Sequence, residues 1–290
     1  MSENIKIYDA HVHYLWRDSV TENCAAFAAL REKGLQGMGL IIMGHHLPDP
    51  QQCFEFIPHS YHDRIGQQLF AGSSGMAVPE PGLFAGIEMF PYLDSRYITA
   101  TEADLSGFRE AGFRGLKLLY VPDEDELYGM VGWKKLFGRS QKDYEAVTLR
   151  MIEQAVNYGW PVIFHVDLRL HEAFVRHILQ NYPEHPFIFP HFGFSRKIMA
   201  RLIEQFDTCY TDFSSLLPFM QQAPEAYKNF ITEYQTRVLF GSDATTDWPE
   251  LVSDYIDTVK NLFDDQGILE NIMQHNYLEI HQNRDLKQKG

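Results

Sequence analysis

Short apolar runs alternate with longer amphipathic stretches along most of the chain. Such runs are typical of buried strands, and apolar residues at helical spacing are typical of the helices that cover them. The runs that predict strands are residues 5–9, 39–43, 83–90, 115–119, 161–166, 187–190, 208–213 and 238–240. The stretches that predict helices are residues 21–31, 101–111, 143–158, 172–181, 196–206, 223–234, 248–263 and 268–280. Strands that alternate with helices form a parallel sheet covered by those helices.

The number of strand–helix units indicates the architecture. Eight units in a chain of 290 residues predict an α/β fold, a (β/α)8 TIM barrel. An open, doubly wound sheet is the alternative, and it is disfavoured because no Gly-x-Gly-x-x-Gly follows the first strand. Barrels of this length are commonly single domains, so residues 1–290 are expected to form one domain.

The segment 47–78 does not follow the alternation. It is rich in Pro, His and aromatic residues, with one stretch of helical character at 63–70. Long excursions in a compact domain are often lids or binding loops. A lid over the site and a packed structural insertion are equally consistent with this composition.

Composition excludes several classes of partner. The formal net charge is −14 and there is no run of basic residues, so neither nucleic acid nor an anionic membrane is an expected partner. Cys24, Cys53 and Cys209 are scattered, which predicts reduced thiols rather than a disulfide framework. Because no apolar run has the length of a signal core or a membrane span, we expect a cytoplasmic protein. Assembly into a homo-oligomer stays open.

The candidate chemistry lies at the ends of the predicted strands. His11 and His13 follow the first strand, and alternation along a strand directs both to one face, where they can bind one metal ion. Functional groups of a barrel sit at the C-terminal ends of its strands. The other polar residues at these ends are His45, His46, Lys117, Tyr120, His165, Asp167, Arg169, His191, Asp212 and Asp243. Any one of these histidines alone would be interpreted as a core or rim residue. Their recurrence at one end of several strands favours a metal site.

Several segments resemble the amidohydrolase superfamily, and most closely its amidohydrolase-related branch (amidohydrolase 2). They are residues 9–13 (DAHVH), 112–117 (GFRGLK), 161–165 (PVIFH), 190–193 (PHFG), 238–243 (VLFGSD) and Asn276. The resemblance implies a metal-dependent hydrolase barrel with a divalent ion held by His11, His13, His165 and Asp243. It implies that His191 is a further ligand or a catalytic residue beside the metal.

The chemistry of these side chains is consistent with those roles. A metal ion with an open position lowers the pKa of its bound water to ~7. Asp243 can take a proton from that water and pass it to a leaving group. His191 can polarise a carbonyl oxygen or orient the water. We expect one zinc ion, or two if Lys117 is carboxylated as in binuclear members of the superfamily. Manganese or another divalent ion is the alternative.

Basic and polar groups around this centre predict an anionic small-molecule substrate. Lys117, Tyr120, Arg169 and His45 are the expected substrate-binding residues, with Arg17 and His46 nearby. A guanidinium binds a carboxylate in bidentate fashion. Each basic residue has a structural alternative, which is a salt bridge with a neighbouring acid.

Two enzyme classes fit this set of residues. The first is a hydrolase of a C–O or C–N bond in a small carboxylated molecule such as a lactone or an amide. The second is a decarboxylase of an aromatic or enoic acid that uses the same ligands. Metal-dependent DNase and phosphoesterase barrels fit less well, because Lys117 stands where the DNase type has a glutamate. A binding barrel without catalysis is the fourth interpretation.

Overall fold

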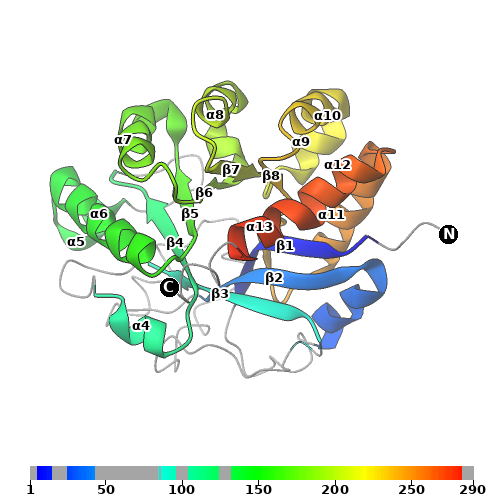
Figure 1. Cartoon of the computed structure of the whole chain (residues 1–290), viewed down its shortest axis with the longest axis horizontal. Helices are drawn as coiled ribbons and strands as arrows, with labels where there is room; N and C mark the ends of the chain where they lie inside the picture. The colour runs from blue at the N-terminus through cyan, green and yellow to red at the C-terminus, as the bar shows by residue number, and fades with distance from the viewer. Residues whose placement is uncertain are drawn as a thin grey trace.

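The computed structural model describes residues 5–14, 25–42, 84, 86–95, 104–123 and 132–282. Its strands form one parallel sheet in the order β8-β7-β6-β5-β4-β3-β2-β1-β9. They are β1 (Ile7–Tyr14), β2 (Leu35–Ile42), β3 (Glu88–Asp94), β4 (Gly115–Tyr120), β5 (Val162–Val166), β6 (Phe187–Phe189), β7 (Cys209–Asp212), β8 (Val238–Leu239) and β9 (Ala244–Thr245). The sheet curls, and helices lie along its outer side (Figure 1).

The two ends of this sheet are joined by the short segment 240–243. β8 pairs with β7, and β9, directly after that segment, pairs with β1. The amide of Ala10 donates to the carbonyl of Phe240, and the amide of Asp243 donates to the carbonyl of His11, both at 2.8 Å. β8 and β9 are thus two pieces of an eighth strand, and the chain forms the predicted TIM barrel.

Helices follow the strands in the predicted alternation. They are η1 (Ala29–Lys33), α4 (Ser106–Glu110), α5 (Trp133–Phe137), α6 (Gln141–Asn157), α7 (Leu168–Asn181), η3 (Pro190–Phe194), α8 (Arg196–Ile203), α9 (Leu217–Gln222), α10 (Pro224–Glu233), α11 (Pro249–Leu262), α12 (Gln266–Glu270), η4 (Asn271–His275) and α13 (Asn276–Gln282). Ser140 and Asp143 form a capping box at the start of α6. Within the described ranges, every helix is too short or too polar to cross a membrane.

Some predicted boundaries were wrong. β3 begins at Glu88, five residues later than the predicted start at 83. The helix predicted at 101–111 begins only at Ser106. α7 starts earlier than predicted, because the Asp167 side chain accepts from the amide of Arg169 and caps the helix there. The helix predicted at 268–280 is divided into α12, the π-helical turn η4 and α13. The proposed lid at 47–78 lies outside the described residues.

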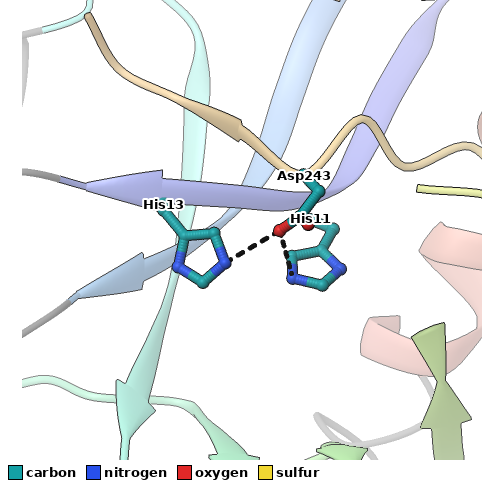
Figure 2. Close-up of side chains that lie close together, drawn as sticks. All are labelled: His11, His13 and Asp243. Atoms are coloured by element: carbon teal, nitrogen blue, oxygen red, sulfur yellow. Dashed lines mark ion pairs between the residues drawn. The ribbon is translucent and has the colours of Figure 1, made fainter. Parts of the chain in front are cut away.

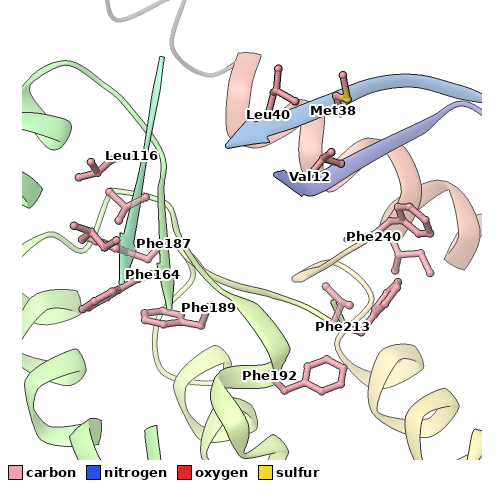
Figure 3. Close-up of a cluster of buried hydrophobic side chains, with 14 of the residues drawn as sticks. Val12, Met38, Leu40, Leu116, Phe164, Phe187, Phe189, Phe192, Phe213 and Phe240 are labelled. Carbon is pink, nitrogen blue, oxygen red and sulfur yellow. The ribbon is translucent and has the colours of Figure 1, made fainter. Parts of the chain in front are cut away.

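The core consists of two layers on opposite faces of the strands. The larger layer lies between strands and helices and is rich in phenylalanine (Figure 3). The smaller layer fills the barrel interior below the strand ends and includes Ile41, Ile163, Ile188 and Leu239. Alternation along each strand separates the two layers, so Phe164 faces the helices while its neighbour Ile163 faces the interior.

A register shift in β1 decides which side chains of that strand face the interior. Tyr8 and Ala10 belong to the interior layer, whereas Val12 belongs to the helix-facing layer. Strict alternation would place Ala10 and Val12 on the same face. The pairing with β2 is irregular between Asp9 and Val12, and this bulge reverses the alternation. As a result, His11 and its neighbour Ala10 both face the interior, which strict alternation along the strand would not allow.

The packing of β2 against β1 gives a test of this arrangement. We expect Gly39→Ala to lower the free energy of unfolding by about 1–3 kcal/mol, because the core has no room for an added methyl group. A Cβ at Gly39 would lie 2.6 Å from the carbonyl oxygen of Ala10 and 2.9 Å from the hydroxyl of Tyr277. Urea denaturation measures the change. Gly107→Ala in the exposed helix α4 is the control, since nothing lies within 4 Å of its Cβ. Equal effects of the two substitutions would contradict the close approach.

Candidate metal centre

Three predicted ligands converge at the C-terminal end of the barrel. His11 and His13 come from β1, and Asp243 comes from the segment before β9 (Figure 2). The Asp243 Oδ1 lies 2.9 Å from the Nε2 of His13 and 3.1 Å from the Nε2 of His11. All three residues are buried, and their candidate ligand atoms lie within 4.8 Å of one another.

The hydrogen bonds of His11 show that this cluster suits a cation. The Nζ of Lys117 lies 2.9 Å from the Nε2 of His11. A lysine ammonium is only a donor, so that Nε2 carries a lone pair. The ionised Asp243 carboxylate, which also only accepts, faces the same nitrogen. A cation between two acceptors removes their repulsion, and imidazole with carboxylate is a donor set that suits zinc. The residues present therefore fit a divalent metal ion.

Asp212 holds the other side of the His11 ring. Its Oδ2 accepts from the His11 Nδ1 at 3.2 Å. Burial lowers the pKa of His11 to about 4, and the positive charge of Lys117 acts in the same direction. Burial alone would raise the pKa of Asp212, but the hydrogen bonds that it accepts from His11 and Ser214 outweigh it and lower that pKa. Asp212 thus orients a neutral ligand histidine, as is common in metal sites.

The electrostatics of Asp243 follow the same pattern. Burial opposes its ionisation, but the neighbouring His11 and His13 hold its pKa well below the ordinary value. The Ser215 hydroxyl donates to the Oδ2 of Asp243. The carboxylate therefore has one oxygen bonded to Ser215 and the other directed at the histidines.

His165 and His191 lie beside the three-residue cluster rather than inside it. The ring of His191 is centred 5.6 Å from that of His11, and the ring of His165 is centred 5.3 Å from that of His191. Burial lowers the pKa of His165 well below its ordinary value, and the neighbouring His191 and Lys117 act in the same direction. His165 is therefore a neutral imidazole next to the cluster, and its position is compatible with a part in metal binding.

Lys117 belongs to the cluster itself. Its side chain is almost fully buried, and its ammonium contacts the His11 nitrogen that faces Asp243. This position is adjacent to the candidate metal position, where either a carboxylated lysine or a substrate-binding ammonium can act.

Two of the predicted substrate-binding residues have partners outside the cluster. The Tyr120 ring stacks on Tyr144 with centroids 5.2 Å apart, and its hydroxyl donates to Glu145 at 2.9 Å, so it lies between β4 and α6. Arg169 forms a bidentate pair with Asp167, with a shortest distance of 2.6 Å. Arg17, His45 and His46 lie outside the described residues.

Sequence reasoning missed Ser214 and Ser215. Both follow Asp212 directly at the end of β7. Ser214 contacts the rings of His11 and His191, at 3.1 and 2.9 Å from Nδ1 in each case. The only available signal was their position at a strand end, because serine is too common in loops to mark a site.

Backbone strain gathers around this centre. In the described parts of the chain, the non-glycine residues with positive φ are His191, Phe192, Phe194, Ser215 and Asp243. They follow β6, β7 and β8, at the end of the barrel that carries the candidate ligands. A left-handed conformation costs an L-residue about 1–2 kcal/mol. Strain of this kind persists where the surrounding structure fixes it, and it is typical of functional sites.

Asp9 is hydrogen-bonded to both of the segments that carry His11 and Asp243. Its Oδ1 accepts from the amide of His11 at 3.0 Å and from the amide of Ser242 at 3.1 Å. Burial raises the pKa of Asp9 to about 7. In the structure Asp9 contacts the backbone of the ligand residue rather than its ring.

A family comparison agrees with this geometry. A model of the family described as amidohydrolase matches residues 77–276, more than half of the chain. The chain belongs to the amidohydrolase family. This confirms the resemblance found in the sequence segments. His165, His191 and Asp243 lie inside the matched span of this amidohydrolase, and His11 and His13 precede it. A search of curated proteins finds no match.

Solved structures with the same fold include three relatives of low identity. A TIM-barrel protein from Bordetella bronchiseptica is 12% identical, with a TM-score of 0.58, and covers 97% of this chain and 100% of its own. A proposed metal-dependent hydrolase from Lactobacillus casei is 14% identical, with a TM-score of 0.55, covering 97% and 96%. The phosphotriesterase homology protein from Escherichia coli is 12% identical, with a TM-score of 0.51, covering 94% and 98%. At these identities the likeness shows the fold alone.

The lowered pKa of His11 gives a pH-dependent test in metal-free protein. The unfolded chain protonates this residue near its ordinary value of 6.5, whereas folded His11 resists protonation down to about pH 4. Acidification through this interval therefore favours unfolding by on the order of 3 kcal/mol through His11. We expect His11→Asn, which has no titrating ring, to lose less stability over that interval than the wild type.

Urea denaturation with a chelator present, at both ends of the interval, measures the difference. Comparing wild type with variant separates His11 from Asp9, whose raised pKa acts in the opposite direction. His275→Asn, at an exposed position, is the control and should follow the wild type. Parallel curves for His11→Asn and wild type would show that the folded protein does not resist protonation of His11.

Proposed function

We propose that this amidohydrolase is a metal-dependent hydrolase of a C–O or C–N bond in a small, carboxylated molecule such as a lactone or an amide. The observation that carries the proposal is the convergence of two imidazole nitrogens on one buried carboxylate oxygen at the end of a barrel. Family membership supports the reaction class.

His11, His13 and Asp243 would hold the ion, with His165 and His191 at the edge of the same space. We propose zinc as the ion. When bound there, it supplies a Lewis acid that makes water reactive at neutral pH.

Asp243 is suited to move the proton. Its pKa is held well below the ordinary value, so it is an ionised acceptor at neutral pH. We propose that it takes the proton of the attacking water and gives it to the departing oxygen or nitrogen. Ser215 fixes the carboxylate through Oδ2 while this happens.

Binding of a substrate carboxylate is assigned to the basic groups near the cluster. Lys117 is closest, since it already lies against His11. Arg169 is half-exposed and paired with Asp167, so a substrate carboxylate would have to replace that partner. His45 is retained in the proposal on sequence grounds.

The first test is the metal content of protein purified without chelators. We expect about one zinc ion per chain, since a single cluster of this kind holds one ion. His13→Ala and His165→Ala should lose metal and activity together while remaining folded. His185→Ala is the matched control, because it removes a buried histidine outside the cluster. A content of about two ions would instead assign Lys117 as a carboxylated bridge. Full metal and activity in His165→Ala would exclude His165 from the site.

The second test concerns proton transfer. Asp243→Asn keeps the size of the side chain but cannot accept a proton, so we expect kcat to fall by about 100- to 10,000-fold. A series of carboxylated lactones and amides is the substrate panel, and released acid is the readout. Carbon dioxide release is followed in parallel, because the decarboxylase reaction would use the same residues. Undiminished kcat in Asp243→Asn would remove Asp243 from the chemistry.

A further inference from the structure

Ser214 contacts the candidate site at three points. It is completely buried after the end of β7. Its Oγ lies 3.1 Å from the Nδ1 of His11, 2.9 Å from the Nδ1 of His191 and 2.5 Å from the Oδ1 of Asp212. This one hydroxyl therefore connects side chains that come from β1, η3 and β7.

The number of donors and acceptors at this hydroxyl decides where the protons are. A serine hydroxyl has one proton to donate and two lone pairs that accept. The ionised Asp212 carboxylate has only acceptors, so the hydroxyl proton is directed at Asp212. The two lone pairs then face the Nδ1 atoms of His11 and His191. Each of these nitrogens must carry a proton.

Two other contacts also place a proton on the Nδ1 of each of these rings. The carbonyl oxygen of Ser214 lies 2.7 Å from the Nδ1 of His191, and a carbonyl can only accept. On the other ring, Lys117 donates to the Nε2 of His11, which leaves the proton of a neutral His11 on Nδ1. The position of Ser214 is itself fixed, because its amide donates to the Oδ1 of Asp212 at 3.0 Å.

We infer that Ser214 is a positioning residue that holds both His11 and His191 in the Nδ1–H tautomer. Both Nε2 atoms then present lone pairs on the far side of each ring from Ser214. The sequence left two roles open for His191: a ligand, or a group that polarises a carbonyl or orients a water. In the Nδ1–H tautomer the lone pair of His191 is on Nε2, which accepts rather than donates, so His191 suits a ligand or a proton acceptor. This consequence for His191 rests on the proposed function, whereas the tautomer assignment rests on the contacts alone.

Nitrogen-15 NMR of the histidine rings tests the tautomers in metal-free protein near neutral pH. Nδ1–H and Nε2–H rings differ in the chemical shifts of the two nitrogens, and His11→Asn and His191→Asn assign the signals. We expect both rings to be the Nδ1–H form. An Nε2–H form at either ring would overturn the assignment.

Ser214→Ala tests the contribution of the hydroxyl to metal binding. Partners of ligand histidines typically change metal affinity by about 10- to 100-fold, and we expect a loss of this size for zinc, measured by competition with a chromogenic chelator. Thr211→Val is the matched control. It removes another fully buried hydroxyl, which lies in β7 three residues before Ser214, donates to the Phe189 carbonyl at 2.5 Å and faces away from the site. Its zinc affinity should match the wild type.

The outcomes separate this inference from the proposed function. Wild-type zinc affinity in folded Ser214→Ala would overturn the positioning role. If Ser214→Ala does not fold, Ser214→Cys keeps the volume with a weaker donor and should show the same loss of zinc affinity, and unchanged affinity there would overturn the role. Wild-type protein that binds no zinc would contradict the proposed function, while the ring tautomers would still confirm or overturn the assignment.

Discussion

The site depends on the placement of one neutral imidazole between two buried carboxylates. Asp212 meets the Nδ1 of His11 and Asp243 faces its Nε2. Burying two carboxylates requires donors for each of them. Asp212 receives them from the amides of His191 and Ser214 and from the Ser214 hydroxyl. Asp243 has Ser215 on one oxygen, but its other oxygen faces imidazole nitrogens. That oxygen and the two imidazole nitrogens form a donor set that suits a divalent cation, which is why the cluster makes electrostatic sense as a metal centre.

Much of this could be predicted from the sequence, because it follows from periodicity. The alternation of strands and helices predicted the barrel. The rule that strand ends meet at one rim predicted that His11, His13 and Asp243 lie together. Tyr120 shows how the same rule should have been applied more fully. It lies three residues after Lys117 on one strand, so the two side chains point to opposite faces. A position near a strand end in the sequence is not sufficient, because the face of the sheet to which a side chain points decides whether it reaches the site.

Other features had no signal in a single sequence. The bulge in β1 depends on pairing with β2, and it allows both Ala10 and His11 to face the interior. Ser214 and Ser215 act through distances to residues from other strands, and nothing in a Ser-Ser pair marks this. The left-handed turn at His191 to Phe194 is equally invisible, because Phe192 and Phe194 are residues that local propensity would place elsewhere.

The seam at which the barrel closes has a consequence for its dynamics. β1 is joined to the segment 240–246 by hydrogen bonds that use the carbonyls of His11 and His13 as acceptors, from the amides of Asp243 and Thr246. Two of the backbone hydrogen bonds that close the barrel therefore involve the candidate ligands themselves. Local opening of this seam would separate Asp243 from both His11 and His13 in a single event. An ion bound by ligands on both sides of the seam would hold the seam closed. Metal occupancy and the rate at which the barrel opens would therefore be linked.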